Sequence, residues 1–175
     1  DTAPPVATTS EGSLDRTVES TDDAGWEAAM ALAPAFRDAC AGDIAPRPPE
    51  TSSIPDAGCA GGVVVERRWS ALDACGNASP DFVQRITIVD HTPPTLVCPP
   101  DQLIVTGPGP VTFAPTATDA MGTPVVTCDP PSGSTFPMGR TVVTCRATDG
   151  CGNSTICQFK VTVTAFGCAG CSQEA

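Results

Sequence analysis

The sequence predicts an all-β chain: two small β-sandwiches in tandem, a short helix inserted in the first, and disulfides stapling both. Three observations support this fold class. Short apolar runs alternate with turns, and the chain holds 19 Pro and 16 Gly, which is typical of short strands joined by tight turns. One turn segment occurs twice. Ten cysteines can cross-link cores that would be thin by themselves.

The repeated segment is Ala71–Ala78 (ALDACGNA), which returns as Ala147–Ser154 (ATDGCGNS). Its Asp can bond the backbone that follows, Gly supplies a positive φ, and Asn tolerates the left-handed region. Each copy therefore predicts a hairpin turn between two strands. The strands expected beside the turns are residues 63–71 and 82–89 in the first domain, and 140–148 and 156–164 in the second.

The repeat divides the chain into residues 1–89, residues 90–165 and a cysteine-containing tail, residues 166–175. Both domains open with similar letters, DTAPP at residue 1 and DHTPP at residue 90, and the prolines of the second opening stiffen the linker. In the first domain, residues 43–62 predict a weakly patterned strand and a loop. Further strands of the second domain are expected at 95–98, 102–106, 111–114 and 125–128.

Residues 21–33 predict the helix of the first domain. An Asp cap and early acidic residues precede an Ala/Leu/Met run, which is a helix start signal. Trp26, Met30 and Ala33 would share one face, and Pro34 would end the helix. We expect Trp26 to fill the core rather than to serve as a platform for a ligand.

The charge of the chain restricts its partners. A net charge of -11 and a pI near 4.2 argue against binding to nucleic acid or anionic membranes. No apolar run approaches the ~20 residues of a transmembrane helix, so membrane insertion is not expected. The acidic surface either keeps the protein soluble or also helps to bind Ca²⁺.

The sequence offers no catalytic set. The one histidine, His91, lies in the Pro-rich linker, and the motifs GxSxG, HExxH, GxGxxG and the P-loop do not occur. We therefore expect neither enzyme activity nor a cofactor. Asp73 and Asp149 could be Ca²⁺ ligands, although Asp more often stabilises such turns. Sequons begin in the same turns, at Asn77 and Asn153.

The cysteine spacing favours disulfides over metal. Zinc sites use paired CxxC or CxxC and HxxxH spacings, and only Cys168 and Cys171 form a CxxC. Disulfides in an oxidising, extracellular compartment are the better interpretation. A redox role for this CxxC would need a helix start after a βαβ pattern, so a local disulfide or a crosslink to a neighbouring chain is favoured over catalysis.

An ordered set of segments runs through residues 90–164: Pro93-Pro94, Cys98-Pro99, PTATD (115–119), CDPPSGSTFPMG (128–139), VTCRATD (143–149) and CQFKVTV (157–163). This set resembles the hyalin repeat (HYR) domain. Residues 1–89 resemble a diverged relative at 38–40, 67–77 and 84–90, and depart from it at 7–35 and 43–62. The resemblance implies immunoglobulin- or fibronectin-III-like sandwiches with an extracellular adhesive or spacer role and no catalytic residues.

The implied sandwich also suggests disulfide pairs. Cys40 and Cys75 fall in loops that share one pole, so we expect them to pair. In the second domain Met121 stands where Cys40 would be, which deprives Cys151 of that partner. Each disulfide would contribute roughly 3–4 kcal/mol by loop entropy. The other expected pairs are Cys98–Cys157, joining the first and last strands, and Cys128–Cys145, joining neighbouring strands.

Two cysteines, Cys59 and Cys151, are left without a partner by this scheme. We hypothesise that they bond to each other and link the two domains. Alternatively, Cys151 pairs with a cysteine of the tail, or both are free.

These features predict a non-enzymatic extracellular or cell-surface protein, a rigid disulfide-bonded pair of sandwiches used as a spacer, coat or filament subunit. Its expected partners are proteins, in particular copies of itself. The alternative is an accessory module of a larger secreted enzyme or adhesin, binding carbohydrate or acting with Ca²⁺. Carbohydrate binding would need exposed aromatic residues, and the chain has no Tyr and two Trp. A Ca²⁺-dependent pair would have a chelator-sensitive melting temperature.

Overall fold

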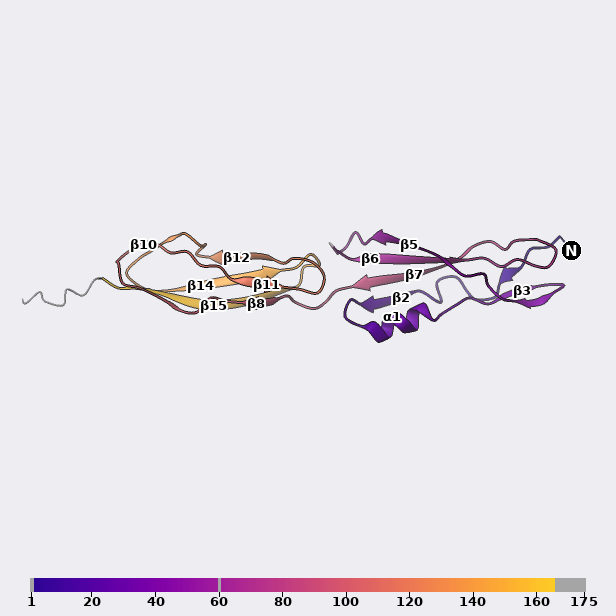
Figure 1. Cartoon of the computed structure of the whole chain (residues 1–175), viewed down its shortest axis with the longest axis horizontal. Coiled ribbons are helices and arrows are strands. Elements are labelled where there is room, and N and C mark those ends of the chain that lie inside the picture. Colours follow the sequence, from indigo (N-terminus) through magenta and orange to yellow (C-terminus); the bar gives the residue numbers. More distant parts are fainter. Residues whose placement is uncertain (1, 60, 166–175) are drawn as a thin grey trace, which may run out of the picture. The chain divides into compact units, whose positions relative to one another are not determined.

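The computed structural model describes residues 2–59 and 61–165. The chain divides into two units, Asp1–His91 (unit 1) and Thr92–Ala175 (unit 2). Apart from one helix, both consist of short strands in stacked sheets (Figure 1). This confirms the predicted fold class, an all-β chain of immunoglobulin- or fibronectin-III-like sandwiches with one short helix.

Unit 1 has a four-stranded and a three-stranded sheet. The larger has the order β2 (Arg16–Glu19), β7 (Phe82–Val89), β6 (Val63–Trp69) and β5 (Glu50–Pro55). The smaller has the order β1 (Val6–Ala7), β3 (Phe36–Asp38) and β4 (Gly42–Ile44). The sequence predicted β6 and β7, which are antiparallel neighbours. The weakly patterned strand of residues 43–62 is the exposed edge strand β5 together with β4.

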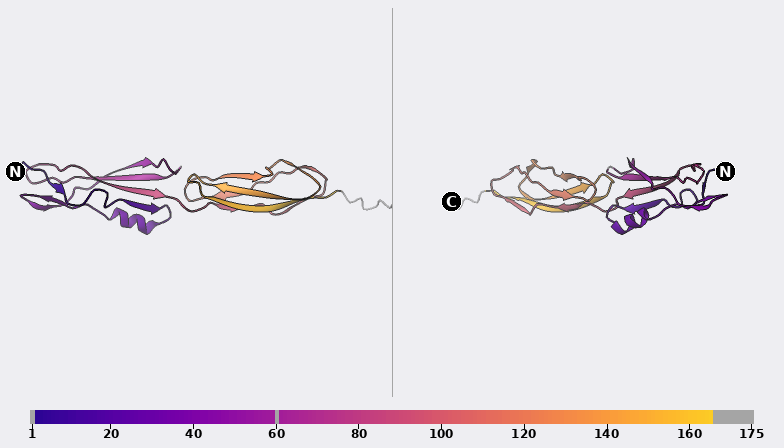
Figure 2. Two further views of the ribbon diagram at one scale, coloured as in Figure 1. Left: turned by 180° about the vertical axis from the view of Figure 1, so that it is seen from behind. Right: turned by 45° about the vertical axis from the view of Figure 1, so that its right-hand side comes forward.

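The helix α1 (Asp23–Met30) is capped by Asp22, whose side chain accepts a hydrogen bond from the backbone N–H of Gly25. It lies alongside β2 on the flank of unit 1 (Figures 1 and 2). Ala29 is buried, and Trp26 and Met30 pack beside it against the core. The predicted face was therefore right for these residues and wrong for Ala33, which is exposed because the helix ends before it.

A buried polar pair separates two small cores in unit 1. One core holds Val18, Ala29, Val65 and Ile86, and the other holds Phe36, Trp69, Ala71 and Phe82. Between them Arg67 donates a 2.9 Å hydrogen bond to Gln84 Oε1 and stacks 4.5 Å above the Trp69 ring. Arg67 and Gln84 also donate to the backbone carbonyl oxygens of Ala29, Leu32 and Leu14.

The larger sheet of unit 2 has the order β12 (Val125–Asp129), β14 (Gly139–Thr148), β15 (Ser154–Val163) and β9 (Gln102–Ile104). Two short ladders complete the unit: β8 (Thr95–Val97) with β11 (Thr116–Thr118), and β10 (Gly109–Pro110) with β13 (Thr135–Phe136). Alternate residues of β14 and β15 enter the core with Val111 and Phe136. β14 and β15 form the repeated hairpin, as predicted.

The strand expected at residues 111–114 is absent from the described fold. The backbone N–H of Val111 donates to the carbonyl of Ser134, and that of Phe113 to the Ser132 hydroxyl, so this segment is tied to a loop and not to a strand ladder. Prolines at 108, 110 and 115 remove N–H donors from the same stretch. The strands that form instead are β10 and β11.

In each unit, an early strand lies parallel to the last one. β2 is parallel to β7, with Arg16 opposite Ile86 and Glu19 opposite Val89. β9 is parallel to β15, with Gln102 opposite Val161. Since parallel strands start at the same end of a sheet, the chain enters each pair at one end and leaves it at the other.

Candidate functional site: the disulfides and the aspartate turns

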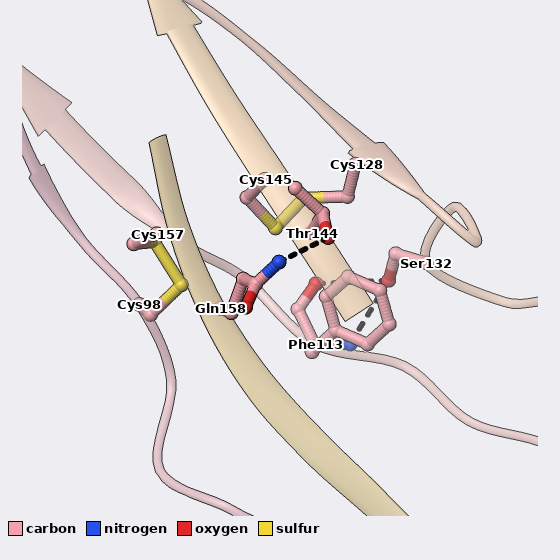
Figure 3. The surroundings of a disulfide bond; sticks show 8 residues. All are labelled: Cys98, Phe113, Cys128, Ser132, Thr144, Cys145, Cys157 and Gln158. Carbon is pink, nitrogen blue, oxygen red and sulfur yellow. Dashed lines mark hydrogen bonds between the residues drawn. A yellow bond between two sulfur atoms is a disulfide. The ribbon is translucent and has the colours of Figure 1, made fainter. Parts of the chain in front are cut away.

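Three cysteines of unit 2 lie in one row across the large sheet. Cys128 of β12 faces Cys145 of β14, and Cys145 faces Cys157 of β15. Cys128 and Cys145 form a disulfide with a Cα–Cα distance of 4.0 Å. Cys157 bonds instead to Cys98, which follows β8, with a Cα–Cα distance of 5.9 Å (Figure 3). Both expected pairs are therefore formed in the structure.

Both disulfides pack against the core of unit 2. Cys145 is completely buried, and Cys98, Cys128 and Cys157 border the same cluster. Phe113 closes the cluster with an edge-to-face contact to Phe159, at 4.9 Å between ring centroids. The Ser132 hydroxyl holds Phe113 by its backbone N–H and carbonyl (Figure 3). Both bonds thus lie at the border of the core, with Cys98, Cys128 and Cys157 partly buried.

The repeated turns are organised by an aspartate. Asp73 Oδ1 accepts hydrogen bonds from the backbone N–H of Cys75 and Asn77, at 2.9 and 2.8 Å. Asp149 Oδ1 accepts the same two bonds in unit 2, from Cys151 and Asn153, at the same distances. Both Asp residues are thus turn-stabilising groups, which was the commoner of the two interpretations of their sequence pattern.

These hydrogen bonds lower the pKa of both carboxyls. For Asp73 the side chain of Asn77 is the largest cause, and the backbone N–H groups of Asn77 and Cys75 add to it. For Asp149 burial raises the pKa, but the side-chain and backbone donors of Asn153 outweigh it. Both turns are therefore held by ionised carboxylates at neutral pH.

The asparagine side chain of each sequon forms a hydrogen bond within the same turn. The side-chain nitrogen of Asn77 donates to Asp73 Oδ2 at 2.7 Å, and that of Asn153 donates to Asp149 Oδ2 at 2.9 Å. This nitrogen is the atom that N-glycosylation would modify. Attaching a glycan there would remove a bond that holds the turn.

The expected Cys40–Cys75 disulfide is not formed: both residues carry free thiols and are exposed. Cys40 follows β3 of the three-stranded sheet, and Cys75 follows β6 of the four-stranded sheet. The two loops lie at one end of unit 1, as expected (Figures 1 and 2), but they follow strands of different sheets and their thiols stay unbonded.

The remaining cysteines are only partly described. Cys59 and Cys151 are each disulfide-bonded, so neither is the free thiol that one alternative allowed. The hypothesis that they bond to each other stays a prediction. Cys168 and Cys171 lie outside the described residues.

A second type of aspartate turn occurs in each unit. Asp38 accepts from the backbone N–H of Cys40, and Asp119 accepts from that of Met121, which places Met121 at the position of Cys40. Asp119 and Asp149 belong to a group of carboxylates whose oxygens lie within 4.8 Å of one another. Ca²⁺ takes six to eight oxygen ligands, and an acidic group by itself does not define a metal site.

His91 contacts the end of β2. Its backbone N–H donates to Glu19 Oε1 at 2.7 Å, and its Nδ1 lies 3.0 Å from Glu19 Oε2. The backbone bond from His91 is the largest cause of a lowered pKa at Glu19, followed by the side-chain bond. The imidazole is exposed and has no nucleophile beside it among these contacts.

No aromatic platform for a sugar ring is found in the described part of the chain. Trp69 is buried and Trp26 is packed against the core. A depression of about 410 Å³ in unit 1 is lined by polar and charged residues, and one of about 440 Å³ in unit 2 has Phe113 as its aromatic residue. Within the described residues, no helix has the length and apolarity needed to cross a membrane.

Comparison with protein families finds a match for the second unit. The HYR domain family matches residues 89–163, which contain both disulfides and the second aspartate turn. Residues 89–163 are an HYR domain. The match begins at residue 89 and therefore does not cover unit 1.

Comparison with curated proteins finds no match. Among solved structures, similar ones include the extracellular cadherin domains 1-4 of Protocadherin Gamma B7 (9% identity, TM-score 0.37, covering 93% of this chain and 51% of that chain). Another is Drosophila N-cadherin EC1-3 (14%, 0.34, 94% and 68%). A third is the fibronectin(III)-like modules of Clostridium thermocellum CbhA (12%, 0.33, 98% and 100%). The chain spans about half the length of the protocadherin fragment.

Proposed function

We propose that this chain is a non-enzymatic extracellular spacer that carries tension between the ends of its units and binds other proteins. The observation that carries the proposal is the Cys98–Cys157 disulfide of the HYR domain. It joins residues 59 positions apart, and only short segments of unit 2 lie outside the closed loop. Tension that enters at the start of the unit therefore crosses to β15 through a covalent bond.

The strand order of both units supports the same role. Because β2–β7 and β9–β15 are parallel, tension that reaches the early strand of a pair strains the hydrogen bonds of that pair together, in shear. In unit 2 this applies once the Cys98–Cys157 bond, which bypasses β9, is reduced. In an antiparallel hairpin pulled from its open end, the bonds would instead break one at a time. The arrangement resists extension along the direction in which a spacer is pulled.

The other features of the chain fit a surface protein. Six of the described cysteines are disulfide-bonded, which is expected of a protein in an oxidising, extracellular compartment. The depression of unit 1, lined by polar and charged residues, does not resemble the apolar sites that small ligands commonly occupy. Protein partners, copies of the chain included, are therefore favoured over a small-molecule substrate.

Single-molecule stretching of the full chain tests the proposal. With the disulfides intact, unit 2 should release only the short segments outside the Cys98–Cys157 loop. After reduction, its unfolding should lengthen by about 200 Å, since 59 residues extend by roughly 3.5 Å each. Unit 2 that extends equally far in both states would contradict the proposal.

A further inference from the structure

One side of the large sheet of unit 2 lies open to solvent. Successive side chains of a strand point to opposite sides of its sheet, so the neighbours of the buried Val143 and Val161 lie on the side away from the core. We call this side the outer face. Its apolar side chains Val142 and Ile156 are 45% and 50% exposed. The residues that define the outer face are Leu103, Arg140, Val142, Arg146, Ile156 and Lys160.

The outer face is the basic part of an acidic chain. Unit 2 has three Lys and Arg residues, and all three lie on this face: Arg140, Arg146 and Lys160. Lys160 lies 3.7 Å from Asp101, whereas the ion pairs among the described residues include neither arginine. Free cations beside exposed aliphatic side chains favour an acidic partner.

Unit 1 has a complementary surface. It contains 15 Asp and Glu residues against six Arg, a net charge of -9. Its helix α1 packs one side against the core, while Asp23 and Glu27 lie one turn apart on the exposed side. Neither belongs to an ion pair of the described residues, and the last turn of α1 has no basic residue. The exposed Ala24 and Ala28 lie next to them.

Other carboxylates of unit 1 are less suited to bind a partner. Glu19 contacts His91, Glu66 pairs with two arginines, and the turn aspartates accept backbone hydrogen bonds. Glu11 and Asp81 are exposed, but they lie singly in connections between strands. Among the described residues α1 also has no counterpart in unit 2. Its acidic side is therefore the regular surface of unit 1 that remains open to a partner (Figures 1 and 2).

We propose that the outer face of unit 2 binds the acidic side of α1 in a second copy of this chain. The arginines of the outer face meet Asp23 and Glu27, and its aliphatic side chains meet the alanines between them. The inference rests on the proposed function and extends it, because it names the partner and both surfaces. A contact between unlike surfaces of two copies does not close on itself, so it joins copies in series.

The size of the outer face predicts a weak contact. The ten residues of β14 span about 34 Å and the four strands about 19 Å, which gives a flat area of about 600 Å². A standard interface uses about 800 Å² on each partner. The eight residues of α1, about 12 Å long, fit within this area. We therefore expect association that depends on charge and weakens with salt.

Sedimentation equilibrium of the full chain, with its free thiols alkylated, tests the proposal. At low salt the average mass should rise above the 17.7 kDa of the monomer between about 10 µM and about 1 mM protein. At about 1 M salt, where charges are screened beyond about 3 Å, it should return to the monomer value. The sheet variant Arg140→Glu/Arg146→Glu and the helix variant Asp23→Lys/Glu27→Lys should each stay monomeric.

Mixing the two variants supplies the control for folding, because each provides the charge that the other has lost. The mixture should associate although neither variant does so alone. Two matched variants change the net charge equally at other exposed positions: Arg37→Glu/Arg47→Glu and Glu11→Lys/Asp81→Lys. Both should keep the association of the wild type.

Three outcomes would overturn the proposal: a wild type that is monomeric at every concentration, association that survives in either charge-reversed variant alone, or a mixture that stays monomeric. A monomeric wild type that binds heparin through Arg140 and Arg146 would also overturn it, since the outer face would then serve an anionic polysaccharide. The stretching experiment uses single chains. It therefore tests the spacer function whether or not copies associate.

Discussion

At the scale of single residues, charged side chains stabilise this small fold by hydrogen-bonding several groups at once. Asp73 holds three donors of one turn. Arg67 holds the end of α1, because its guanidinium reaches the carbonyl oxygens of Ala29 and Leu32 while stacking on Trp69. Burial lowers the pKa of Arg67, but a guanidinium is so strongly basic that it stays charged at neutral pH. The contributions of Asp73 and Arg67 to stability can be measured separately by Trp emission, since both Trp residues lie in unit 1.

The Asp73 turn should make unit 1 sensitive to acid. The pKa of Asp73 is lowered in the folded protein, so its stabilising effect is fully present above the unfolded value of about 3.9 and is lost as pH falls through the lower folded pKa. Urea unfolding followed by Trp emission should show midpoints that fall below about pH 4. In Asp73→Asn the midpoint at neutral pH should be lower and this fall shallower.

The exposed Asp81 provides the matched control for that experiment. Asp81→Asn should keep both the neutral-pH midpoint and its dependence on acid. An Asp73→Asn curve that follows the wild-type curve at every pH would show that the carboxylate does not hold the turn.

Replacing Arg67 with Met should destabilise unit 1 by about 3 kcal/mol, because charged hydrogen bonds are lost and Gln84 keeps a buried acceptor without a donor. Arg68→Met is the control. The side chain of Arg68 is 44% exposed and pairs with Glu66, and exposed pairs contribute at most about 1 kcal/mol. Equal losses for the two variants, measured by urea unfolding with Trp emission, would refute the role of Arg67.

At the scale of elements, sequence pattern was reliable where strands are long and alternate. β6, β7, β14 and β15 were predicted because their alternation and the turns between them agree. The strands of two to four residues in both units were mostly missed, since such short ladders leave little periodicity. The segment at residues 111–114 alternates like a strand, but its hydrogen bonds go to Ser132 and Ser134, which depends on tertiary structure.

The disulfide predictions likewise succeeded where the sequence follows the family pattern and failed where it departs from it. Cys98–Cys157 and Cys128–Cys145 lie in the HYR domain, where the resemblance fixed the order of the strands. Cys40 and Cys75 lie in unit 1, where the sequence departs from that pattern. There the resemblance placed the loops at one pole, but the two thiols are free.

Removing the disulfides of the HYR domain should lower its stability in proportion to the loops that they close. By loop entropy, Cys98→Ala/Cys157→Ala should cost about 4 kcal/mol and Cys128→Ala/Cys145→Ala about 3 kcal/mol. Calorimetry should assign both losses to one transition, while the transition seen by Trp emission stays unchanged. A larger loss for the shorter loop would mean that packing around the buried Cys145, and not loop closure, dominates.

At the scale of the whole molecule, we propose that the strand order of each unit resists tension applied between its ends. In unit 2 the intact Cys98–Cys157 bond carries this tension past β9, and after reduction the parallel pairing of β9 with β15 carries it. The sequence predicted two domains and their disulfide character. It did not predict the parallel pairs, because they join segments far apart in the chain and leave no local pattern.

The most direct test compares two pulling directions on unit 2 in the full chain, with the disulfides reduced so that hydrogen bonds alone resist. Click-chemistry handles at residues 92 and 164 pull the ends of the unit and, once β8 has separated from β11, shear β9 against β15. Handles at Gly139 and Val163, which face each other at the open end of the β14–β15 hairpin, unzip that hairpin. The account predicts a clearly higher unfolding force between residues 92 and 164. An equal or lower force in that direction would contradict it.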